Sequence, residues 1–158
     1  MNSVLKILIE LNRRRSDIAE KHMQEMRSEY ALRMTQEIKY AEALERTQEE
    51  LATRKIHVQQ LIQTLVKSDQ LLIQLHRIQD LKEEFQKAQQ ILEIAKIATI
   101  KANTDYNIAQ AAYFRLIAKI EVCKTEYKTL QTEQKRQKEQ KSEQELDDNY
   151  CKQKGSAA

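Results

Sequence analysis

The near-absence of glycine and proline constrains this chain more than any other feature of its sequence. Proline does not occur among the 158 residues, and the one glycine, Gly155, stands close to the end. Globular domains contain about 7% glycine and about 5% proline, mainly in tight turns. Long helices are therefore expected. The same scarcity excludes β-sandwiches, barrels, doubly wound folds and sites that need a glycine-rich phosphate loop.

Charge and hydrophobicity are both spread along the chain. Lys and Arg number 27 against 24 Asp and Glu, and 41% of the residues are hydrophobic. A nucleic-acid-binding or membrane-surface protein more often concentrates its cations, and simple disorder is less apolar. The apolar run from Val4 to Leu11 is interrupted by Lys6 and Glu10, so we interpret it as one face of a helix. We therefore expect a rod that binds no nucleic acid and inserts into no membrane.

The second half of the chain carries a continuous heptad stripe. From Ile78 to Leu130, alternating steps of three and four residues always meet an apolar, aromatic or threonine side chain. About seven heptads exceed the three or four that indicate a coiled coil. One series of positions is rich in alanine, which lets a neighbouring helix approach closely. The stripe consists of Ile78, Leu81, Phe85, Ala88, Leu92, Ala95, Thr99, Ala102, Tyr106, Ala109, Tyr113, Leu116, Ile120, Cys123, Tyr127 and Leu130.

The first half carries a looser stripe. Its clearest members recur every seven residues, but Gln48 and Lys55 fall at positions where a strong coiled coil would be apolar. We predict that this stripe faces the second one. Its members are Leu44, Leu51, Val58 and Leu65, with Ile62 between them, Tyr30, Met34 and Ile38 upstream, and Val4, Leu8, Leu11 and Ile18 near the start.

The chain is expected to turn at Ser68 and Asp69, which are good N-cap residues between the two stripes. The predicted fold is all-α, a long antiparallel two-helix coiled-coil hairpin over residues 1–150. Its arms span about 4–67 and about 71–148, its turn lies at about 68–70, and residues 151–158 form a disordered tail. A single unbroken helix paired with a second chain is the alternative.

No pattern of polar residues predicts catalysis. His22, His57 and His76 lack the spacing of metal ligands, and a rod offers its carboxylates no enclosed pocket. We expect no enzymatic activity, no metal and no cofactor. The two cysteines, Cys123 and Cys151, would stand about 42 Å apart on one helix, which prevents their pairing and suits the cytoplasm.

Two features indicate binding to a partner. Arg13, Arg14 and Arg15 form the one basic cluster, which either pairs with Asp17 or Glu20 or contacts an acidic rim on another protein. Between residues 91 and 120 the helix is apolar around more than half of its circumference, and one partner helix cannot cover that. Ile94 and Ile97 lie on this extra apolar flank.

Three segments resemble the FliJ/YscO (SctO) family of flagellar and virulence type III secretion systems. The first is the apolar start followed by the arginine cluster and Ala19-Glu20-Lys21, which resembles the opening of that family. The second, just past the turn, comprises Asp69, Leu72, Ile78 and Leu81. The third comprises Lys128-Thr129-Leu130 and Glu143-Gln144-Glu145-Leu146-Asp147-Asp148, which resembles the closing pattern Gln-Lys-Glu-Leu-Asp-Glu.

The resemblance implies a non-enzymatic stalk protein in the cytoplasm, peripheral at the secretion apparatus. Its coiled coil would enter the hexameric secretion ATPase and couple it to the cytoplasmic domain of the export-gate membrane protein, and secretion chaperones are further candidate partners. The alternatives are a homodimeric coiled-coil spacer or scaffold, and an export chaperone that binds secreted subunits. The candidate partner-binding residues are Arg13, Arg14, Arg15, Ile78, Leu81, Ile94, Ile97, Leu146 and Asp147.

Overall fold

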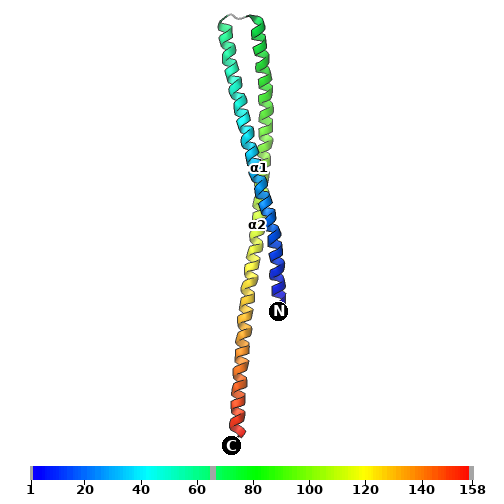
Figure 1. Ribbon diagram of the computed structural model, residues 1–158, viewed down its shortest axis with the longest axis vertical. Helices are drawn as coiled ribbons and strands as arrows, with labels where there is room; N and C mark the ends of the chain where they lie inside the picture. Colours follow the sequence, from blue (N-terminus) through cyan, green and yellow to red (C-terminus); the bar gives the residue numbers. More distant parts are fainter. Residues whose placement is uncertain (1, 65–66, 157–158) are drawn as a thin grey trace. The chain divides into compact units, whose positions relative to one another are not determined.

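Two long helices make up the computed structural model, which describes residues 2–64 and 67–156 (Figure 1). Helix α1 spans Asn2–Gln63 and helix α2 spans Ser68–Ser156. The described residues contain no strand, and the two helices pack against each other. The prediction of an all-α helical hairpin is confirmed.

Local sequence explains why both helices run so far without a break. Their interiors consist mostly of strong helix formers, with no proline. Threonine is a weaker helix former, but here its hydroxyl returns to the helix backbone. Thr47 donates to the carbonyl oxygen of Ala43 at 3.0 Å, and Thr125 donates to that of Glu121 at 2.9 Å. The polar side chains therefore leave the helical hydrogen bonds intact.

The connection between the helices lies earlier than the sequence indicated. The Lys67 carbonyl oxygen accepts hydrogen bonds from the backbone N–H groups of Gln70 at 3.2 Å and Leu71 at 3.4 Å. Ser68 and Asp69 therefore belong to the first turn of α2, where the negative charge of the Asp69 carboxylate interacts favourably with the helix dipole. Arm one ends at Gln63 rather than near residue 67. Leu65, the last member of the predicted first stripe, lies outside the described residues.

Contacts divide the chain into two compact units, which we describe separately. The hairpin unit is His22–Ala109, and the terminal unit combines Met1–Lys21 with Gln110–Ala158. In the hairpin unit, every stop of the α2 stripe from residue 78 to residue 109 is buried or half-buried. Leu81 is 0% exposed, which makes it the most completely buried large side chain described. This part of the predicted seam is confirmed.

The terminal unit has a sparser core. Ile120 and Ser16 are its buried residues, and the remaining stripe positions up to Leu130 are half-buried. Every described residue beyond Leu130 is exposed, although α2 continues to Ser156. The tail predicted as disordered over 151–158 is helical as far as residue 156, where Lys152, Gln153 and Lys154 extend the helix-forming composition of the preceding residues.

Helix α1 packs with a different side from the one predicted. Leu44, Leu51 and Val58 do face the seam. The other seam position of each heptad lies three residues after each of them, whereas the prediction placed it four residues after. The buried or half-buried stripe consists of Leu5, Ile9, Asn12, Ser16, Ala19, Met23, Met26, Tyr30, Arg33, Glu37, Leu44, Thr47, Leu51, Arg54, Val58 and Leu61. The predicted members that are exposed instead are Val4, Leu8, Leu11, Ile18, Met34, Ile38 and Ile62.

In the hairpin unit, the alanine-rich part of the α2 seam leaves room for a polar residue of α1. Arg33 lines a groove with Ala95 and Ala98, where its hydrocarbon stem is half-buried while its guanidinium pairs with Glu29 at 2.8 Å. The buried hydroxyl of Ser16 donates to the carbonyl oxygen of Arg13 at 2.8 Å, so it leaves no unsatisfied hydrogen-bond donor. A polar residue of α1 can therefore face the seam if it is small and bonds to its own helix, or if it is long enough for its polar end to reach water.

Candidate interaction surfaces

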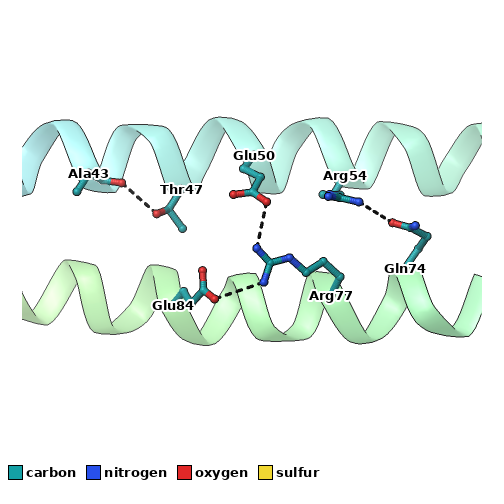
Figure 2. A network of polar contacts seen from close by, with 7 residues as sticks. All are labelled: Ala43, Thr47, Glu50, Arg54, Gln74, Arg77 and Glu84. Carbon is teal, nitrogen blue, oxygen red and sulfur yellow. Dashed lines mark hydrogen bonds and ion pairs between the residues drawn. The ribbon is translucent and has the colours of Figure 1, made fainter.

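A polar network crosses the two helices near the connection (Figure 2). The guanidinium of Arg77 on α2 lies 3.2 Å from a carboxylate oxygen of Glu50 on α1 and 3.5 Å from one of Glu84 on its own helix. One turn away, Arg54 donates to the side-chain oxygen of Gln74 at 3.1 Å. The Arg77–Glu50 and Arg54–Gln74 contacts join opposite helices, so they help to fix the register of the hairpin unit.

Arg77 remains charged throughout the physiological pH range. The hydrogen bond to Glu50, opposed by desolvation and supported by the charge of Glu84, raises the pKa of Arg77 above its already high ordinary value. A raised pKa means that the basic group stabilises the fold below its unfolded pKa and loses that effect only as pH rises through the folded value. The ion pairs of Arg77 therefore provide no switch through its own titration near neutral pH.

We expect Arg77→Gln to lower the thermal midpoint of unfolding only slightly, because the ion pairs are exposed to solvent and ions. The decrease should shrink in high salt, where the ion pairs of Arg77 are already screened. Thermal unfolding followed by circular dichroism at low and high salt measures both effects. Arg27→Gln is the matched control, since Arg27 is exposed in the same unit and forms no ion pair within the described residues. Equal decreases for the two variants would contradict the prediction.

Close approach of the helices is visible around Thr99. Its hydroxyl lies 2.9 Å from the carbonyl oxygen of Ala95 on its own helix and 3.3 Å from that of Arg33 on α1. Seven residues further along α2, the ring of Tyr106 stacks on that of Tyr30, with centroids 6.5 Å apart and planes 3° from parallel. The small residues of the seam thus bring the backbones close enough for a threonine to reach across, and the tyrosines fill the space between alanines.

Exposed isoleucines cover the outer side of α2 in the hairpin unit. Ile94 and Ile97, both predicted from the apolar flank, are exposed. Tyr40 of α1 forms a shallow groove with Ile91, Ile94 and neighbouring alanines. An apolar surface of this kind is typical of a binding site. The exposed isoleucines of this stretch are Ile91, Ile94, Ile97, Ile100 and Ile108.

The start of α1 presents a second candidate surface, in the terminal unit. Arg13, Arg14 and Arg15 are all exposed, and Arg14 pairs with Glu10 at 3.4 Å rather than with the acids that follow. Arg14 also lines a shallow surface hollow with Lys6, Ile7, Glu10 and Leu11. The outward apolar side chains and the arginines therefore share this short stretch of helix.

Two of the predicted partner-binding residues are not available to a partner. Ile78 and Leu81 are buried in the seam of the hairpin unit, where they belong to the heptad stripe. A residue that fills the seam cannot contact another protein unless the helices separate. Leu146 and Asp147, by contrast, are exposed on the last part of α2.

Neither a metal site nor a membrane span was found in the part of the chain that the structure describes. No three His, Cys, Asp or Glu side chains there form a group that could hold a metal ion. Neither helix contains a stretch apolar and long enough to cross a bilayer within residues 2–64 and 67–156. Cys123 and Cys151 are both free. Two candidate binding surfaces remain. One is the set of exposed isoleucines on α2 in the hairpin unit, and the other is the start of α1 in the terminal unit, with its arginines and exposed apolar residues.

Comparison with known proteins adds no further identification. No protein-family model, curated protein or solved structure matches the chain.

Proposed function

We propose that this chain is a non-enzymatic stalk protein of a type III secretion system. It inserts its paired helices into the hexameric export ATPase and couples that ring to the cytoplasmic domain of the export-gate membrane protein. It works in the cytoplasm, at the secretion apparatus. The proposal rests on the resemblance of the arginine cluster and of the closing segment around Leu146 and Asp147 to the FliJ/YscO family.

One observation supports this role most directly. The terminal unit buries little beyond Ser16 and Ile120, so most of its side chains point to solvent. Arginines, outward apolar residues and a long charged stretch of α2 all belong to this unit. A helix pair surrounded by a ring of subunits needs such groups on its outside, because each subunit meets a different side of it.

The mechanism requires a stiff rod rather than an active site. A stalk that contacts six subunits unequally favours different conformations in different subunits, and so biases which one binds or releases nucleotide. Residues 2–63 and 68–154 contain neither glycine nor proline, so these helices lack the residues at which long helices usually kink. We therefore expect each helix to transmit a displacement along its own length with little bending.

The test is to measure ATP turnover and hexamer assembly of the export ATPase from the same organism, with and without the purified chain. We expect the chain to promote both. Reversing the charges of Arg13, Arg14 and Arg15 to glutamate should weaken binding about tenfold or more, since Arg is a frequent anchor at interfaces. Absence of binding, together with unchanged turnover, would reject the proposal.

A matched triple variant separates this effect from a general loss of positive charge. Arg27, Lys39 and Lys55 are exposed cations of the hairpin unit, and none of them forms an ion pair within the described residues. Their reversal to glutamate changes the net charge by the same amount. We expect this control to leave ATPase binding close to that of the unaltered chain.

A further inference from the structure

A second heptad stripe runs along α2 on a side next to the seam, with Ala98 and Asp105 half-buried at its edge. We call it the outer stripe, and its members are Ile94, Ala98, Lys101, Asp105 and Ile108. They are separated by alternating steps of four and three residues, so at about 100° per residue they fall within an arc of about 80°. Ile94 is 68% exposed and Ile108 is 63% exposed. An apolar-charged stripe with this period is suited to pairing with another helix.

The two charges of the outer stripe have no ion-pair partner among the residues that the structure describes. Lys101 and Asp105 are four residues apart on the helix, yet neither forms an ion pair within residues 2–64 and 67–156. Lys101 is exposed and Asp105 is half-buried beside the seam. A cation and an anion thus stand in the middle of the outer stripe, with Ile94 and Ala98 on one side and Ile108 on the other.

The order of these residues is complementary to itself when read in the opposite direction. In two antiparallel copies with a two-fold axis midway between positions 101 and 105, Lys101 of each copy faces Asp105 of the other. Ala98 of each copy likewise faces Ile108 of the other. Each of these layers then pairs a large side chain with a small one, or a cation with an anion, as a two-fold interface requires, while Ile94 lies beyond them and faces no member of the outer stripe.

We propose that the chain forms a reversible two-fold homodimer through the outer stripe. Charge complementarity also selects the register. A shift of one heptad would place Ile94 opposite Asp105 and Lys101 opposite Ala98, which buries both charges without partners. The two charges therefore destabilise a dimer in the shifted register as well as stabilising the dimer in which Lys101 faces Asp105.

A second copy of this chain is the partner that the outer stripe fits, because Lys101 and Asp105 offer each copy the charges that the other needs. The stripe covers about 21 Å of helix, which is short for an obligate dimer and suits a weak, reversible one. The proposed dimer uses the hairpin unit, so it goes beyond the stalk function, which rests on the terminal unit.

Sedimentation equilibrium of the full chain from about 1 to about 200 µM tests the proposal, since dimer population follows mass action. We expect the mean mass to rise towards twice that of the monomer. Lys101→Asp places two like-charged pairs at the two-fold axis, and so does Asp105→Lys. Each variant alone should weaken dimerisation about tenfold or more. Mixing the two should restore it, because every Asp of one variant then faces a Lys of the other.

The double exchange of Lys101 and Asp105 should also restore the dimer, since it reverses both charges of each pair. Lys82→Asp, on the same helix but outside the outer stripe, is the matched control and should leave dimerisation unchanged. Likewise Ile108→Glu should abolish the dimer, whereas Ile56→Glu, at an exposed isoleucine of α1, should not. Circular dichroism checks that each variant remains helical.

Two results would overturn the proposal. One is a mass that stays at the monomer value over the whole concentration range. The other is failure of the mixed single variants to associate, which would show that positions 101 and 105 do not face each other. Both measurements are made without the ATPase, so they are independent of whether the chain acts as a secretion stalk.

Discussion

Replacing Leu81 with alanine should lower the free energy of unfolding by about 3 kcal/mol, the largest loss expected from any single truncation in the hairpin unit. Leu81 is 0% exposed. Its removal leaves a cavity between two stiff helices that cannot easily close around it, so the cavity cost adds to the lost burial. Urea denaturation followed by circular dichroism measures the loss as a lower midpoint with little change in slope.

Leu72→Ala is the matched control for this experiment. Leu72 lies on the same helix in the same unit but is 53% exposed. Its truncation should cost less than about 1 kcal/mol, because much of its apolar surface is in water before unfolding. Similar losses for the two variants would contradict the assignment of Leu81 to the centre of the seam.

The packed side of α2 could be predicted from the sequence because one stripe dominates it. From Ile78 to Leu130 each core position holds an apolar, aromatic or threonine residue, and all of these positions are buried or half-buried. No competing stripe is as long. The extra isoleucines had to lie outside the seam, since a single neighbouring helix covers only one side.

The packed side of α1 could not be predicted in the same way because two stripes compete. Ile18 belongs to the more apolar one and is 71% exposed, whereas Ser16, in the other, is 6% exposed. Apolar content alone favours the wrong choice. What decides is the partner: the α2 stripe of the terminal unit holds large side chains such as Leu116 and Ile120, which leave room for a small serine whose hydroxyl bonds to its own helix. This depends on pairing between distant parts of the chain.

Register explains which parts of the candidate surfaces the sequence missed. The contact between Arg77 and Glu50 depends on where the chain turns, and the turn was expected a few residues too late. Ile78 and Leu81 were assigned both to the stripe and to a partner, although a buried side chain cannot serve both. The exposure of the arginines and isoleucines could be predicted without knowing the register. There are more of these residues than one seam can bury, so some of them had to lie outside it.

The terminal unit is expected to depend on Ile120 even more than the hairpin unit depends on Leu81. Ile120 is 5% exposed, and the stripe of α1 in this unit is rich in small or polar residues such as Asn12, Ser16 and Ala19. Ile120→Ala removes the one buried apolar side chain of this unit that the structure describes. A short helical stretch without packing frays in water. Amide hydrogen exchange over residues 5–19 should therefore become about 100-fold faster.

The same substitution should leave amide exchange around residues 78–92 unchanged, because those residues belong to the hairpin unit and keep their own core. Val122→Ala, at an exposed position two residues along the same helix, is the control and should leave both regions protected. Unchanged protection of residues 5–19 in Ile120→Ala would contradict the prediction. If exchange accelerated equally in both regions, the two units would open together, and the stability of the terminal helices would come from the hairpin unit rather than from Ile120.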